Sequence, residues 1–290
     1  MTGIQKEKNR VASLSVVAAV FLTGFKLLVG LLTGSLGILS EALHSGLDFV
    51  AAGITWIAVR ISDRPADEDH HYGHGKIENL SALIETLLLL ITCVWIIYEA
   101  IKRLSSGETH IEVTVWSYVV VISSIIIDFS RSRALMRVAK KYNSQALEAD
   151  ALHFSTDIWS SLVVLIGLIC ASFGIFMADS IAALAVALIV IYVSYRLGKR
   201  AISVLLDKVP AETHMKIVSV LEGIKEIEAY HDLKVRAAGA EIFAELNIHV
   251  APDMDLQTSH DIATGIEKKI RSEIPRCNVH VHIEPNQHSE

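Results

Sequence analysis

The sequence is poor in charged residues and in cysteine, and it lacks an excess of positive charge. Charged residues make up 20% of the 290 residues, below the roughly 25% usual in soluble chains, and hydrophobic residues make up 52%. The net charge of −6 argues against nucleic acid as a partner, because phosphate binding requires a basic face. The three cysteines form no CxxC motif and indicate neither a disulfide framework nor a compartment. With a mean hydropathy of +0.44, these scarcities exclude a disordered or fibrous chain and favour a membrane protein.

Six apolar runs have about the length of 20 residues that spans a hydrocarbon core about 30 Å thick. They lie at about residues 11–32, 37–59, 80–101, 113–130, 152–174 and 178–195. The first run is longer than the apolar part of a signal peptide and five more follow it, so we expect it to be retained. The sequence therefore predicts a six-helix domain in the lipid bilayer, over residues 1–208.

Basic residues gather in the connections on one side of the predicted bundle, which the positive-inside rule assigns to the cytoplasm. They are Lys6, Lys8, Arg10, Arg60, Arg64, Lys76, Arg131, Arg133, Arg137, Lys140, Lys141, Arg196, Lys199 and Arg200. We therefore predict a protein of the inner, or plasma, membrane with both termini in the cytoplasm.

The composition changes in residues 209–290, where no run is long enough to span a bilayer. Helical periodicity covers residues 212–227 and 256–274, and strand alternation covers residues 231–236, 241–250 and 278–283. The order α-β-β-α-β predicts a compact cytoplasmic α+β domain, with one sheet and helices on one of its faces.

Two predicted membrane helices carry the same pair of polar residues. His44 and Asp48 lie four residues apart in the second helix, as do His153 and Asp157 in the fifth. Residues at this spacing share a helix face, so packing of the two helices would join two imidazoles and two carboxylates, a tetrahedral set suited to zinc. A single pair of this kind is a helix-packing hydrogen bond about as often as it is part of a metal site. The repetition of the spacing on two helices favours a metal site.

The charge of this site suggests a mechanism. Two carboxylates without a cation would be costly in a membrane, and either a divalent metal or bound protons would neutralise them. Metal ligands must also lose protons to bind, and histidine titrates nearest neutral pH. The sequence therefore predicts a metal–proton antiporter. Asp128, near the end of the fourth run, is expected to snorkel to the interface.

A second group of potential ligands lies in the connection after the second helix. Asp67, His70 and His74 follow a DxxHxxxH spacing there. An acidic, His-rich loop can also be a solvated connection or a weak metal attractor. We favour specific binding, without a requirement for it in transport.

A third group lies in the C-terminal region. Strand alternation places His249 and His282 on polar strand faces, with His231, His260 and Glu284 nearby. A single surface histidine is commonplace, but as a group these residues favour metal binding.

The six runs, the two HxxxD motifs and residues 71–76 (HYGHGK) resemble the cation diffusion facilitator family over nearly the whole chain. The resemblance implies a homodimer that exports Zn2+, or a related divalent ion, from the cytoplasm against protons. It also implies a ferredoxin-like, metallochaperone-like domain at residues 209–290 for metal sensing and dimerisation. The transport site of the family falls on His44, Asp48, His153 and Asp157.

Other family sites fall on further residues of this chain. The loop site falls on Asp67, His70 and His74, and the cytoplasmic binuclear site falls on His231, His260, His282 and Glu284. An inter-domain charge lock is implied between Lys76 and Asp207.

The sequence departs from the family pattern in the cytoplasmic domain. Asn247 stands where some relatives have a ligating histidine, and His249 lies two residues on along the same strand face. Glu284 stands where a close relative type has aspartate. The cytoplasmic site is therefore expected to bind one metal, to bind weakly or to be reorganised around His249.

Three alternatives to zinc export stay open at this point. The first is export of Fe2+, Cd2+ or Mn2+ by the same kind of transporter. The second is a membrane metal sensor or scaffold that transports nothing. The third, an enzyme, is disfavoured because four protein ligands leave no position for a catalytic water and the sequence has no HExxH motif.

Overall fold

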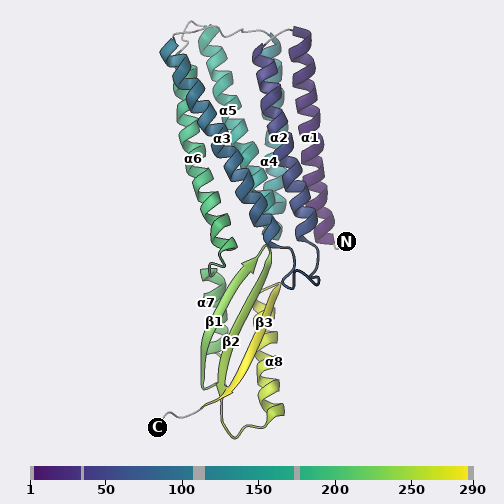
Figure 1. Cartoon of the computed structure of the whole chain (residues 1–290), viewed down its shortest axis with the longest axis vertical. Coiled ribbons are helices and arrows are strands. Elements are labelled where there is room, and N and C mark those ends of the chain that lie inside the picture. The colour runs from purple at the N-terminus through teal and green to yellow at the C-terminus, as the bar shows by residue number, and fades with distance from the viewer. Residues whose placement is uncertain (1–2, 34–35, 107–114, 173–176, 287–290) are drawn as a thin grey trace. The chain divides into compact units, whose positions relative to one another are not determined.

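The computed structural model describes residues 3–33, 36–106, 115–172 and 177–286, and the chain divides into two compact units, residues 1–202 and 203–290 (Figure 1). The first unit is built from long helices. They are α1 (Gly3–Thr33), α2 (Leu36–Ser62), α3 (Lys76–Ser106), α4 (Val115–Tyr142), α5 (Gln145–Ser172) and α6 (Met177–Leu205).

The predicted helical domain is confirmed, and the helices extend beyond the apolar runs. Each has 27 to 31 residues, more than the roughly 20 needed to span a bilayer core. Among the described residues, 3–33, 42–62 and 76–102 are long and apolar enough to cross a membrane by length and composition. Residues 113–114 and 173–174 of the predicted runs lie outside the described part of the chain.

Many large apolar side chains of the first unit point outwards, and many small ones lie between its helices. On α1, for example, Phe21 and Leu32 are exposed whereas Ala12 and Ala19 are buried. Small residues let helix backbones approach closely, and exposed apolar side chains suit a lipid environment. Helix α5 contacts α2, α3 and α4, which brings one of its faces against the face of α2 that carries His44 and Asp48.

The second unit has the predicted α-β-β-α-β order. Its elements are α7 (Ala211–Glu222), β1 (Ala229–Ala238), β2 (Glu241–Val250), α8 (Leu256–Glu273) and β3 (Cys277–Pro285). The sheet order is β1-β2-β3, with β1 antiparallel and β3 parallel to β2.

Both helices of the second unit cover the same face of the sheet, as Figure 1 shows. Leu246 and Ile248 of β2 share one buried cluster with Ile217 of α7 and Ile266 of α8. Side chains alternate between the faces of a strand, so the polar residues between these apolar ones lie on the face that the helices do not cover.

Helix α7 and strand β1 differ most from the predicted ranges, while β3 (Cys277–Pro285) extends past the predicted 278–283 and α8 ends one residue before the predicted 274. Helix α7 ends five residues earlier than predicted, because Gly223 caps it and directs its amide back at carbonyls of the last turn. Ile224 and Ile227 follow the helix and pack against the core without being part of it. Strand β1 is longer than predicted and shifts register between His231 and Lys234.

Candidate metal centre

The two HxxxD pairs meet between α2 and α5. His153 Nε2 lies 3.1 Å from Asp48 Oδ1 and 3.6 Å from Asp157 Oδ2. His44 Nε2 lies 3.7 Å from Asp157 Oδ1. Each histidine therefore faces the aspartate of the opposite helix, as the shared helix face of each pair requires.

The donor atoms of this cluster are close enough to share one cation. Ligand atoms of His44, Asp48 and Asp157 all lie within 4.8 Å of one another, and His153 completes the group through the two contacts just given. Asp48 and His153 are buried, so their charges are shielded little by solvent. Two imidazole nitrogens and two carboxylate oxygens are a donor set that suits a tetrahedral divalent ion such as zinc.

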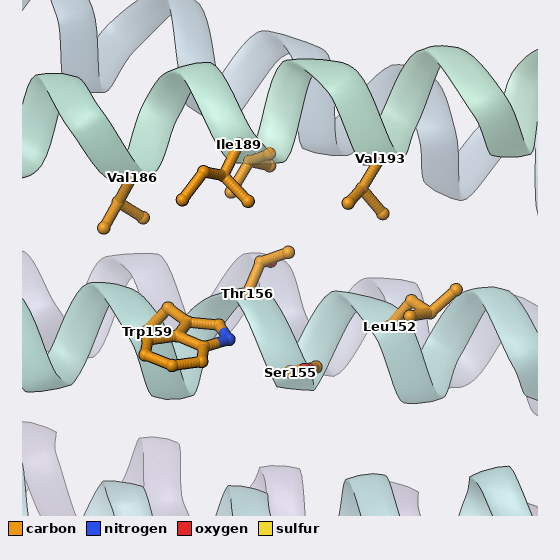
Figure 2. A pocket seen from close by; sticks show the side chains of 8 residues that line it. Leu152, Ser155, Thr156, Trp159, Val186, Ile189 and Val193 are labelled. Carbon is orange, nitrogen blue, oxygen red and sulfur yellow. The ribbon is translucent and has the colours of Figure 1, made fainter.

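A different face of α5 packs towards α6 and offers nothing comparable. A small hollow there is lined mainly by apolar side chains of both helices, with Val186, Ile189 and Val193 of α6 directed towards α5 (Figure 2). Its polar lining side chains include the hydroxyls of Ser155 and Thr156. The potential cation ligands of α5 therefore lie on the face that meets α2.

The loop ligands Asp67, His70 and His74 also converge. Asp67 Oδ1 lies 3.1 Å from His70 Nδ1, and Asp67 Oδ2 lies 3.3 Å from His74 Nε2. Gly73, with a φ of 71°, donates its amide to the His70 carbonyl at 2.9 Å, which closes the turn between the two histidines. The DxxHxxxH spacing thus produces a compact three-ligand group on an exposed loop.

Local hydrogen bonds favour the ionised form of Asp67. Desolvation by its surroundings acts to raise the pKa of this carboxyl, but hydrogen bonds from the backbone and ring of His70 and from the amide of Asp69 hold the pKa below its ordinary value. A carboxylate that is already ionised is ready to bind a cation.

The potential ligands of the second unit lie on the uncovered face of the sheet. His231, His249 and Glu284 place their ligand atoms within 4.8 Å of one another, with Glu284 Oε2 at 3.1 Å from His231 Nε2 and 3.4 Å from His249 Nε2. His282 Nε2 lies 3.7 Å from the other oxygen of Glu284. Asn247 donates its side-chain amide to that same oxygen at 3.0 Å.

Glu284 is therefore the common partner of this group. The hydrogen bond from His231, followed by the charges of the neighbouring histidines, lowers the pKa of its carboxyl. His231 is also held from its other nitrogen, since its Nδ1 lies 3.4 Å from Asp232 Oδ2. Asp232 has a φ of 53° at the register shift of β1, so the irregular backbone helps to aim His231.

Three predicted site residues are not members of these groups. His260 is exposed on α8 and is not part of the three-ligand group that His231, His249 and Glu284 form. Lys76 and Asp207 belong to different units, and their charge lock stays a prediction. Within the second unit, Asp207 Oδ2 lies 3.8 Å from Arg236.

The sequence interpretation missed a buried polar network beside the α2–α5 cluster. The expectation that Asp128 snorkels is wrong in this structure, because Asp128 is buried and accepts a hydrogen bond of 3.1 Å from Arg131. Arg131 donates in turn to Ser15 at 3.2 Å, and Ser15 to Asp150 at 3.3 Å. The only signal in the sequence was the presence of ionisable residues close to apolar runs.

Lys8 forms a second buried cluster at one end of the first unit. It is 1% exposed, and its ammonium lies 2.9 Å from Asp63 and 2.6 Å from Glu78. Glu78 also accepts hydrogen bonds from Ser62 and Ser144, so the cluster joins the ends of α1, α2, α3 and α5. From the sequence, Lys8 is interpreted only as one of the basic residues that assign the cytoplasmic side of the membrane.

The fold and the cluster fit one class of protein, a helical membrane protein with a buried group of histidines and aspartates that could hold a divalent cation. Comparisons with known proteins agree with this class. The family profile described as "Cation efflux transmembrane domain" matches residues 12–206, and the profile "Cation efflux protein, cytoplasmic domain" matches residues 209–286.

Individual relatives match along almost the whole chain. An uncharacterized transporter of Methanocaldococcus jannaschii is 32% identical over 281 residues, which are 96% of this chain and 99% of the relative. The cation-efflux pump FieF of Cronobacter sakazakii is 29% identical over 278 residues, 96% of this chain and 92% of the relative. The metal-bound C-terminal domain of the CzcD transporter from Thermotoga maritima is 25% identical, with a TM-score of 0.26, and covers 28% of this chain and 94% of that domain.

The chain belongs to the cation efflux family, also called the cation diffusion facilitators. It is an integral membrane protein and a cation efflux transporter, not an enzyme. The predictions of family, fold class and transport are thereby confirmed.

Proposed function

We propose that this transporter exports Zn2+ from the cytoplasm in exchange for protons. The observation that carries the proposal is the meeting of His44, Asp48, His153 and Asp157 between α2 and α5, with each histidine beside the aspartate of the other helix. Imidazole and carboxylate donors in equal number favour zinc, whereas sets richer in carboxylate favour harder ions such as Mn2+. Fe2+, Cd2+ and Mn2+ are the competing cargoes.

Proton exchange follows from the charge of the same four residues. With both aspartates ionised and both histidines neutral the site carries two negative charges, which one Zn2+ or two protons would balance. A site that is neutral in either form can change its exposure between the two sides of the membrane at low cost, while an empty, charged site cannot. The result is obligatory exchange of metal for protons.

The ligands come from two helices, so relative movement of α2 and α5 can open the site to one side and then the other. We place both termini in the cytoplasm, as the distribution of basic residues favours. We also propose a homodimer joined through the cytoplasmic domain, since the family resemblance implies it. Alternating access would then be a rocking of helices around a fixed cation site.

The two remaining ligand groups are assigned supporting roles. Asp67, His70 and His74 would bind Zn2+ in the loop after α2. His231, His249 and Glu284, with His282 beside them and His260 as a further predicted ligand, would bind Zn2+ in the cytoplasmic domain and bias the transport cycle. Such regulation requires a coupling free energy between two sites, and substitution at His231 or His282 would remove it.

Flux through proteoliposomes tests the proposal. Purified protein is assayed for uptake of Zn2+, Cd2+, Fe2+ and Mn2+ under an imposed pH gradient, with Asp157→Ala as the site variant and Glu68→Ala, on the exposed loop, as the control. We expect Zn2+ to be the preferred cargo, Asp157→Ala to be inactive and Glu68→Ala to transport normally. A protein that binds Zn2+ but moves no metal would instead be a sensor or scaffold.

A further inference from the structure

Several buried polar atoms at and near the α2–α5 cluster lack a hydrogen-bond partner among the described residues. They include Nδ1 of His153, Oδ1 of Asp150, Oδ2 of Asp157 and Nε of Arg131. Buried polar groups are nearly always paired in folded proteins, so each orphan requires a function or an unseen partner. His153 turns its other nitrogen, Nε2, towards Asp48 and Asp157, which leaves Nδ1 as the nitrogen that faces away from the cation position.

The position of Asp150 makes it a candidate partner for that nitrogen. It lies three residues before His153 on α5, a spacing that places two side chains on the same helix face. Asp150 is 0% exposed and has one oxygen, Oδ2, occupied by the hydroxyl of Ser15 at 3.3 Å. Its second oxygen, Oδ1, is the orphan, so the carboxylate keeps one free acceptor one helical turn from a histidine whose Nδ1 is also without a partner.

Other helices hold Asp150 in place. The hydroxyl of Ser15, on α1, accepts a hydrogen bond of 3.2 Å from Arg131 of α4, and Arg131 also donates to Asp128 at 3.1 Å. The Arg131 guanidinium lies 3.5 Å from the ring centre of Phe154, the residue next to His153. Arg131 therefore contacts α5 directly through Phe154 and indirectly through Ser15 and Asp150.

We propose that Asp150 is a positioning residue for the transport site, and that Arg131 and Ser15 keep its carboxylate in place. In this arrangement Asp150 accepts a hydrogen bond from Nδ1–H of His153 through one bridging water, while Nε2 binds the transported cation. Metal-binding histidines almost always donate their second ring N–H to a carboxylate, carbonyl or water, which selects the tautomer and raises the basicity of the ligating nitrogen. The inference rests on the proposed function, because it assumes that His153 is a ligand.

A purely structural network would behave differently. If Arg131, Ser15 and Asp150 only fastened α4 and α1 to α5, their loss would lower the free energy of unfolding and leave the affinity of the folded transporter unchanged. A positioning role changes the apparent KM for the cation. Loss of such an outer partner costs about 10- to 100-fold in metal affinity or activity.

The test measures initial Zn2+ flux against Zn2+ concentration in proteoliposomes, at one pH. We expect Asp150→Ala to raise KM by about 10- to 100-fold. Asp150→Asn, which keeps an acceptor oxygen but no charge, should lie between Asp150→Ala and the wild type. Glu148→Ala serves as the matched control, because Glu148 is an acidic residue of α5 whose partner is the exposed Arg200, at 2.7 Å.

Two further measurements separate the possible failures. Thermal unfolding without metal shows whether each variant folds. If Asp150→Ala does not fold, KM is measured on Asp150→Asn instead, because asparagine is nearly the same size as aspartate. A wild-type KM in every folded Asp150 variant would overturn the inference. His153→Ala tests the underlying site. If this variant transports Zn2+ with normal KM, the proposed function is wrong. If it loses flux while the Asp150 variants keep the wild-type KM, only the positioning role is refuted.

Discussion

His153 Nε2 lies 3.1 Å from Asp48 Oδ1, which joins a histidine of α5 to an aspartate of α2. The second contact between the helices joins His44 of α2 to Asp157 of α5. Each helix therefore supplies one histidine and one aspartate, and neither supplies all four side chains. If the cluster binds the transported cation as proposed, any movement that separates the two helices would change its affinity for that cation. This division of the ligands makes the cluster suitable for transport and not only for storage of a metal.

The loop group can be tested by metal stoichiometry. We predict that His74→Ala removes one bound Zn2+ per chain, because it takes one of three ligands from the group formed with Asp67 and His70. Transport should continue, since the α2–α5 ligands are intact. His71→Ala is the control, a change of the same type at an exposed neighbour outside the group. Equal zinc content in the two variants, measured by elemental analysis of purified protein, would contradict the assignment.

Glu284 gives the second unit a defined dependence on pH. Its pKa is lowered in the folded state by the hydrogen bond from His231, so the ionised carboxyl contributes stability above its ordinary pKa of 4.5. That contribution is lost as the pH falls through the folded pKa. We predict that acid weakens β3 more in the wild type than in Glu284→Gln, which has no such group to protonate.

Hydrogen exchange of the β3 amides in the full chain measures this difference. The free energy of opening is compared between wild type and variant from neutral pH downwards, and Glu245→Gln serves as a control at an exposed position of β2. If Glu284→Gln loses protection in acid as steeply as the wild type, the ion pair with His231 does not stabilise the strand.

Lys8 provides a test of the buried ion cluster. Lys8→Met leaves Asp63 and Glu78 without the cation that lies 2.9 Å and 2.6 Å from them. Breaking a buried pair by removing one partner costs about 3–5 kcal/mol, so the variant should unfold at a clearly lower temperature in detergent. Lys6→Met, at an exposed position of α1 two residues away, should unfold like the wild type. Identical unfolding of the two variants would show that the cluster contributes no stability.

Features that depend on local spacing could be predicted from the sequence. Both HxxxD pairs, the Asp67–His70–His74 loop and the order of elements in the second unit follow from periodicity within a single segment. The links from Arg131 to Ser15 and from Ser15 to Asp150 could not be predicted, because they exist only when α4, α1 and α5 pack together. The end of α7 was also mispredicted, since Ile224 and Ile227 contact the core without being helical.

The most direct test of the account follows Zn2+ and protons simultaneously in proteoliposomes that contain the purified transporter. The account predicts that inward movement of Zn2+ drives protons outwards, that collapse of the pH gradient slows Zn2+ flux, and that both fluxes vanish together in Asp157→Ala. Zn2+ flux that proceeds unchanged without a pH gradient and moves no protons would contradict it.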